Sequence, residues 1–159
     1  MTGANLNAFT AEKTAPGTSW GSVYAQFTQR TTDIVDASMG LSVKRELLYD
    51  GELKVGSKVK VRITITADRD YDFVQVVDKR AACMEPTSQL TGYRGDYYHS
   101  PRDNATYYYT DMMQKGTHVI ENTYYIDRPG TFTTGTCTVQ CAYSPAYMAR
   151  TKALTITVK

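Results

Sequence analysis

Residues 57–73 read SKVKVRITITADRDYDF and begin with a strict two-residue alternation. Apolar side chains occupy every second position of this run, and lysine, arginine or threonine fills the positions between them. The apolar positions are Val59, Val61, Ile63 and Ile65. A β-strand with one buried and one solvated face has this period. The run ends in a charged corner, Asp68–Asp72, before a second apolar segment begins at Phe73, so it predicts a sheet scaffold.

The same kind of pattern continues from Leu41 to the end of the chain, with almost no helical periodicity. About seven strands at this spacing are typical of an all-β fold, an antiparallel β-sandwich of immunoglobulin-like type. The expected strands are Leu41–Leu48, Ser57–Thr66, Phe73–Asp78, Ala105–Thr110, His118–Ile126, Thr131–Ala142 and Lys152–Val158. Residues 79–104 interrupt the rhythm and are too long for a hairpin loop, so they predict a functional loop or a crossover with a short helix.

The first forty residues differ from the rest in composition. Residues 1–18 are polar, Trp20–Phe27 has the composition of a strand, and Thr28–Gly40 has the composition of a linker. A length of 159 residues suits one domain of ordinary size with a fragment of a second.

Charge and hydropathy argue against two classes of partner. The formal net charge is only +2, and lysine and arginine are spread along the chain, which is not the pattern of a nucleic-acid-binding surface. No apolar stretch approaches the length of a membrane span. The residues after Met1 do not form the basic and then apolar segment of a signal peptide.

The sequence offers few candidates for metal binding. Asp68, Asp70 and Asp72 alternate like the start of a calcium loop, but Phe73 stands where an EF-hand loop needs glycine, which favours a charged turn. His99, a loop residue before Pro101, and His118, a strand residue, lie in different segments without the spacing of metal ligands. We therefore predict no metal-binding and no cofactor-binding residue.

The three cysteines, Cys83, Cys137 and Cys141, are too few for a disulfide framework. Cys137 and Cys141 would share one face of a strand at a distance too great for a bond, whereas a bond from Cys83 to either stays open. A catalytic Cys83 would need a histidine base and an orienting group, and no local signature supplies them. A structural role for Cys83 is favoured, and no catalytic residue is predicted.

The order of several short segments resembles the C-terminal end of bacterial α2-macroglobulin-like proteins. The segments that carry the resemblance are Thr18–Phe27, Leu41–Arg45, Val55–Val61, Asp68–Val74, Arg128–Thr133, Ala142–Pro145 and Ala149–Thr151. The resemblance implies that residues 1–39 are the terminal strand segment and linker of a preceding domain. It implies that residues 40–159 are a C-terminal macroglobulin-type β-sandwich domain.

Members of this family are large exported proteins that trap proteases in the periplasm or at the cell surface. The resemblance therefore implies a non-catalytic domain with a structural or interaction role in a protease-trapping parent. It also implies a fragment of an exported chain, with Met1 added, rather than a cytosolic protein. Some relatives carry a Cys-x-Glu-Gln thioester, but Pro86 stands where residues 83–86 would need glutamine, so no thioester residue is carried over.

The expected partners are the neighbouring domains of the parent chain and, through the parent, proteases. Tyrosine-rich strand faces would suit such docking, and the candidate interaction residues are Tyr107, Tyr108, Tyr109, Tyr124 and Tyr125. Alternation sends Tyr107 and Tyr109 to one face and Tyr108 to the other, so about half of the five would fill the core. The alternative function is a glycan-binding or protein-binding adhesin-type module of a bacterial cell-surface protein.

Overall fold

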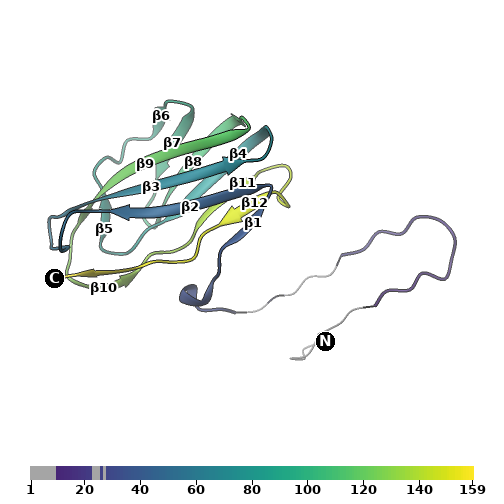
Figure 1. The fold of residues 1–159 in the computed structure, drawn as a ribbon, viewed down its shortest axis with the longest axis horizontal. Helices are drawn as coiled ribbons and strands as arrows, with labels where there is room; N and C mark the ends of the chain where they lie inside the picture. Colours follow the sequence, from purple (N-terminus) through teal and green to yellow (C-terminus); the bar gives the residue numbers. More distant parts are fainter. Residues whose placement is uncertain (1–9, 23–25, 27) are drawn as a thin grey trace.

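The structure, a computed structural model, describes residues 10–22, 26 and 28–159. These residues contain a 3-10 turn, η1, and thirteen strands (Figure 1). The elements are η1 (Thr31–Asp33), β1 (Ala37–Met39), β2 (Leu41–Leu48), β3 (Lys58–Ala67), β4 (Tyr71–Lys79), β5 (Met84–Pro86), β6 (Gly92–Arg94), β7 (Tyr97–Pro101), β8 (Ala105–Met113), β9 (Gly116–Ile126), β10 (Gly130–Thr133), β11 (Cys137–Cys141), β12 (Met148–Arg150) and β13 (Thr155–Val158). No helix in these described ranges has the length and apolar character needed to cross a membrane.

The strands form a two-layered antiparallel sandwich, as the alternation predicts. One layer has the order β5-β9-β3-β2, and the other has the order β12-β11-β4-β8-β7-β6. Strand β1 pairs with both β2 and β12 and so makes the two layers continuous along one side. In Figure 1, β9, β3 and β2 lie in front of β8, β4 and β11, and the two-stranded sheet of β10 and β13 lies at one end.

The core lies between the layers and is filled by the apolar positions of the alternating strands. Val59, Val61, Ile63 and Ile65 of β3 are each 2% exposed or less. They face Val74 and Val76 of β4 and Val139 of β11, which are equally buried. Burial of each such side chain stabilises the fold by about 1.5–3 kcal/mol relative to its exposure. The stretch that predicts the sheet therefore supplies its central strand.

Three segments depart from the predicted strands. The single strand expected over Thr131–Ala142 is divided into β10 and β11, which belong to different sheets. The last strand begins only at Thr155. Before it, the Thr151 amide bonds to the Cys137 carbonyl, and the Leu154 carbonyl accepts from the Thr134 amide, beside the segment that joins β10 to β11. Residues 79–104 form neither a plain loop nor a helical crossover, since they contain β5, β6 and β7.

The boundary expected at residue 40 stays a prediction. Residues 10–22 are exposed and contain no strand, and Val23–Ala25 and Phe27 of the expected strand Trp20–Phe27 lie outside the described residues. The chain joins the sandwich slightly before residue 40, because Asp36 accepts a hydrogen bond from the Lys152 amide at 2.6 Å and β1 pairs with β12.

Gly40 makes the sharp connection between β1 and β2 at the place where the two layers meet. Its φ of +71° lies in the left-handed region that favours glycine. A Cβ atom at this position would overlap the Tyr71 hydroxyl and would lie 2.9 Å from the Tyr147 ring. Both the backbone conformation and the surrounding side chains therefore require glycine.

Replacing Gly40 by alanine should destabilise the domain more than the same change at Gly51. Gly51 has a similar φ of +63° but no atom within 4 Å of an added Cβ, so Gly51→Ala isolates the backbone cost of about 1–2 kcal/mol. Gly40→Ala adds overlap with packed tyrosines, which costs about 1–3 kcal/mol more. Urea unfolding measures both variants, and equal losses would contradict the close packing at Gly40.

Candidate functional site

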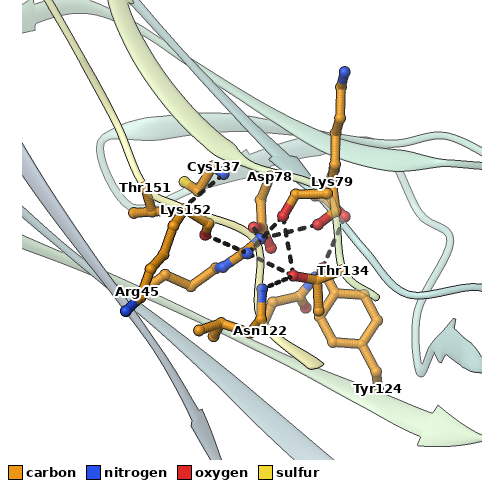
Figure 2. A network of polar contacts seen from close by, with 12 residues as sticks. Arg45, Asp78, Lys79, Asn122, Tyr124, Thr134, Cys137, Thr151 and Lys152 are labelled. Carbon is orange, nitrogen blue, oxygen red and sulfur yellow. Dashed lines mark hydrogen bonds and ion pairs between the residues drawn. The ribbon is translucent and has the colours of Figure 1, made fainter. Parts of the chain in front are cut away.

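A buried ion pair joins the two layers of the sandwich (Figure 2). Arg45 of β2 and Asp78 of β4 approach to 2.9 Å, and both side chains are only 2% exposed. The Arg45 guanidinium also donates to the carbonyl oxygen of Lys79 at 3.0 Å and to the hydroxyl of Thr134 at 2.7 Å. A further bond to the Gly135 carbonyl measures 2.6 Å. Arg45 thus ties β2 to the end of β4 and to the segment between β10 and β11.

The ionised form of Asp78 depends on the charge of Arg45. Burial raises the pKa of the Asp78 carboxyl, and the positive charge and hydrogen bond of Arg45 oppose that shift. The carboxylate therefore depends on Arg45 to keep its charge in the core. Because these charged groups are enclosed and bonded to each other, the arrangement suits structural support rather than chemistry on a ligand.

A second buried polar group lies beside the ion pair and is centred on Tyr124, which is fully buried. The Tyr124 hydroxyl accepts a hydrogen bond from the Asn122 side-chain amide at 3.0 Å and lies 2.9 Å from the Thr106 hydroxyl. Figure 2 shows Tyr124 and Asn122 close to Thr134. The polar end of this large ring is thus satisfied inside the core, as burial of a hydroxyl requires.

Neither Arg45 nor Asp78 is predicted as an important residue from the sequence, although a signal exists. Arg45 shares the inward period of Leu41 and Val43, and Asp78 shares that of Val74 and Val76. A charge at an inward position of each of two strands is the pattern of a buried pair.

Removing one partner of this pair should be strongly destabilising. Arg45→Met or Asp78→Asn leaves the other charge buried without its partner, at a cost of about 3–5 kcal/mol in the free energy of unfolding. The matched control is Glu121→Gln, which weakens the half-exposed pairs with Arg62 and Lys60 and should cost no more than about 1 kcal/mol.

Denaturant unfolding of these variants and of the double variant R45M/D78N provides the measurement. The double variant should lose less stability than the sum of the two single variants, because it leaves no unpaired charge. An Asp78→Asn variant as stable as Glu121→Gln would contradict the role of the pair.

The Asp-rich corner forms a charged turn. The Asp68 carboxylate accepts hydrogen bonds from the Tyr71 hydroxyl at 2.6 Å and from Arg69 at 3.1 Å, and these contacts lower the pKa of Asp68. Asp70 accepts from the Lys115 amide at 2.6 Å, which ties the corner to the turn between β8 and β9. Within residues 10–22, 26 and 28–159, no group of three or more His, Cys, Asp or Glu side chains is arranged to hold a metal ion.

The two histidines lie in different environments. His99 is not a loop residue as expected, because it lies in β7, where it is 1% exposed and packs 5.4 Å from the Tyr108 ring centre. Burial lowers the pKa of His99, which keeps the imidazole neutral in the core. His118 lies in β9 as predicted, and its Nε2 is 2.7 Å from the Gln114 carbonyl.

The thiols of Cys83, Cys137 and Cys141 are buried and unbonded to one another in the described part of the chain. Burial raises the pKa of both Cys83 and Cys137. The Cys141 thiol donates to the Asp72 carbonyl at 3.1 Å. The hydrogen bonds of His99 and His118 go to backbone carbonyls rather than to a thiol. Cys83 and Cys137 therefore lack the low pKa of a nucleophile, and all three buried thiols lack its access to a substrate.

Cys83 should react slowly with a thiol reagent at neutral pH. The native chain at pH 7.5 should label with iodoacetamide on the order of a hundredfold more slowly than the same chain in denaturing urea, because the thiolate forms only on local opening. Peptide mass spectrometry assigns the label to each cysteine. Rapid and selective labelling of Cys83 in the native chain would revive the hypothesis of a catalytic cysteine.

The five candidate interaction tyrosines divide between core and surface. Tyr108 and Tyr124 are 3% and 0% exposed, so they cannot contribute to a surface of the folded domain. Tyr107 and Tyr109 lie on the outer face of β8 with their rings nearly parallel, at a centroid distance of 6.3 Å. Tyr125 lies on β9 in the other layer, with the Lys58 ammonium 5.3 Å from its ring centre. An interaction role for these three stays a prediction.

Two tyrosines that the sequence does not single out extend the surface beside Tyr109. Strand pairing places Tyr93 of β6 opposite Tyr98 of β7, and Tyr98 opposite Tyr109 of β8. Next to them is an open depression of about 650 Å³, lined by these three tyrosines together with Tyr97, Asp96, Asp111, Thr110, Met112, Gln114 and His118. This depression, the Tyr–Asp basin, is a second candidate site.

Comparison with known proteins places the chain in one family. The sequence profile described as "Bacterial Alpha-2-macroglobulin MG10 domain" matches residues 26–146. No curated protein sequence matches the chain.

Solved structures share the fold at low sequence identity. Escherichia coli alpha-2-macroglobulin activated by porcine elastase is similar with a TM-score of 0.71 and 19% identity, over 79% of this chain and 14% of that one. Salmonella alpha-2-macroglobulin reacted with methylamine gives a TM-score of 0.69 and 21% identity, over 78% of this chain and 9% of that one.

Native Escherichia coli alpha-2-macroglobulin from domain MG7 to the C-terminus gives a TM-score of 0.69 and 17% identity, over 80% of this chain and 25% of that one. The chain thus spans between 9% and 25% of these solved structures.

Proposed function

Because the chain belongs to the family of bacterial alpha-2-macroglobulin MG10 domains, we propose that it acts as a non-catalytic domain of a larger, protease-trapping protein. The single observation that carries the proposal is the profile match over residues 26–146, which includes most of the sandwich. In this proposal residues 1–39 end a preceding domain, and residues 40–159 form a macroglobulin domain toward the C-terminus of the parent.

The chemistry of the described residues supports a non-catalytic role. The buried charges Arg45 and Asp78 are bonded to each other, and the thiols of Cys83 and Cys137 are buried with raised pKa values. Neither histidine is hydrogen-bonded to a nucleophile. A site for covalent or acid–base catalysis needs a nucleophile and a base bonded to each other within reach of a substrate.

The role that remains is mechanical. A sandwich whose layers are joined by a buried ion pair moves as one body rather than deforming. Such a domain can hold a contact with its neighbours until cleavage elsewhere in the parent releases it. The solved Escherichia coli relative has been studied after activation by porcine elastase, which motivates the same trigger here.

The partners in this proposal are the neighbouring domains of the parent and, through the parent, proteases. The parent is exported to the periplasm or to the cell surface. The second candidate, a binding module of a cell-surface protein, is favoured by one specific observation, the exposed tyrosines of β6, β7 and β8.

Protease trapping can be tested on the full-length parent protein that contains this chain. The parent is incubated with porcine elastase, and the mixture is assayed on a large protein substrate and on a small chromogenic peptide. We expect loss of activity on the large substrate and retention on the peptide, because a trapped protease still admits small molecules. Small-angle scattering should show a change in radius of gyration after cleavage.

The control is elastase inactivated at its active-site serine, which should leave the scattering of the parent unchanged. The isolated 159-residue chain should digest neither substrate. Full elastase activity on the large substrate in a molar excess of parent would overturn the proposed function.

A further inference from the structure

An exposed ladder of tyrosines crosses the edge of one layer. Tyr93, Tyr98 and Tyr109 are successive cross-strand partners on β6, β7 and β8, which lie together at one side of the sandwich in Figure 1. Their exposed fractions are 76%, 37% and 40%. Side chains directly opposite on neighbouring strands lie on the same face of a sheet. The three rings therefore lie on one face of the layer.

The rings are held in place by contacts with one another. Tyr93 and Tyr98 meet edge to face, with a centroid distance of 5.2 Å and an interplanar angle of 75°. Tyr107 stacks beside Tyr109 at 9° between planes. Aromatic contacts of this kind, one between strands and one along β8, order the side chains before any partner arrives. The Tyr–Asp basin is therefore a preformed surface.

Two carboxylates give the basin its acidic character. Asp96 and Asp111 line it and are exposed, and neither takes part in an ion pair within the described residues. No lysine or arginine is among the described residues that line the basin. In the other layer, by contrast, Glu121 of β9 pairs with both Lys60 and Arg62.

Other tyrosines of the chain make cation–π contacts with its own lysine and arginine side chains. The Lys58 ammonium lies 5.3 Å from the Tyr125 ring centre, and the Arg69 guanidinium lies 5.4 Å from that of Tyr147. Tyr93, Tyr98 and Tyr109 have no such cation in the part of the chain that the structure describes. The ladder thus combines aromatic faces and carboxylates, the two groups that attract a cation, and leaves both unpartnered.

We infer that the Tyr–Asp basin binds an arginine side chain of a partner polypeptide. A guanidinium is planar, stacks on aromatic rings and donates paired hydrogen bonds to a carboxylate, so it fits both components of the basin. A volume of about 650 Å³ leaves room for more than one such side chain. The inference does not rest on protease trapping, since it requires only this surface and a partner with exposed arginine.

Titration of the isotope-labelled 159-residue chain with a synthetic peptide tests the inference. The probe is acetyl-Gly-Arg-Gly-Arg-Gly-Arg-Gly-amide, and its control has citrulline, an uncharged isostere, in place of each arginine. NMR shifts should move at the ring signals of Tyr93, Tyr98 and Tyr109 and at the backbone of Asp96 and Asp111. Binding should weaken as salt rises, because the contacts are exposed.

Variants then separate the two components. Asp96→Asn and Asp111→Asn should each weaken binding by up to about fivefold, and Tyr98→Leu by about two- to fivefold. The controls are Asp50→Asn and Tyr49→Leu, at the turn between β2 and β3, which should leave affinity unchanged. Dispersed amide spectra confirm that each variant is folded.

Equal affinity for the arginine and citrulline peptides would overturn the inference, as would shifts confined to residues outside the basin. A neutral oligosaccharide such as cellohexaose is titrated in parallel. If it shifts the same tyrosine signals while the arginine peptide does not, the surface is a glycan site and the inference is wrong.

Discussion

The pair formed by Arg45 and Asp78 is the constraint on which the rest of the sandwich depends. Two charges enclosed between apolar layers are tolerated only if they meet each other and most of the other guanidinium N–H groups find acceptors. The Arg45 Nε has no such acceptor among the described residues. The acceptors are the Thr134 hydroxyl and the carbonyl oxygens of Lys79 and Gly135. To supply them the chain must leave the sheet after β10 and return as β11, and Gly135 permits this because an added Cβ would overlap the Lys79 side chain. The bonds of Arg45 therefore join β2, the end of β4 and the segment in which the chain changes sheets.

This dependence explains where sequence reasoning succeeds and where it fails. The alternation of Val59 to Ile65 is a local property, and the structure confirms it as a half-buried strand, β3, between β9 and β2. The division of Thr131–Ala142 into two strands cannot be predicted from neighbouring residues. The segment between the two strands is bonded through Thr134 to Arg45, which lies 89 positions away. The period of two says which face a residue occupies but not which strand lies opposite. A charge at an inward position, such as Arg45, is the one signal in the sequence that such a distant partner must exist.

The tyrosines illustrate the same limit at the surface. Alternation places Tyr107 and Tyr109 opposite to Tyr108, and the structure confirms that division by burying Tyr108. The association of Tyr109 with Tyr98 and Tyr93 depends on pairing among β6, β7 and β8, which no local period reveals. In the sequence, residues 79–104 look like an interruption because their strands are short and pair with strands that come later in the chain. In the fold they supply part of the aromatic surface, so the least regular segment carries the more promising candidate site.

The two sites differ in a way that bears on how the domain acts. In the core, the opposite charges of Arg45 and Asp78 form an ion pair, so no ligand is needed to neutralise them and the two layers stay joined. Outside, the tyrosine ladder and the carboxylates of Asp96 and Asp111 are ordered but unpaired within the described residues. A partner that binds a preformed surface loses less conformational entropy than one that must order it. Because the layers are tied together at Arg45, a force applied through the ladder on β6, β7 and β8 would pass to β2 and β3 as motion of the whole sandwich. A rigid core beneath an open cation-binding surface is thus suited to holding a neighbouring polypeptide and releasing it without unfolding.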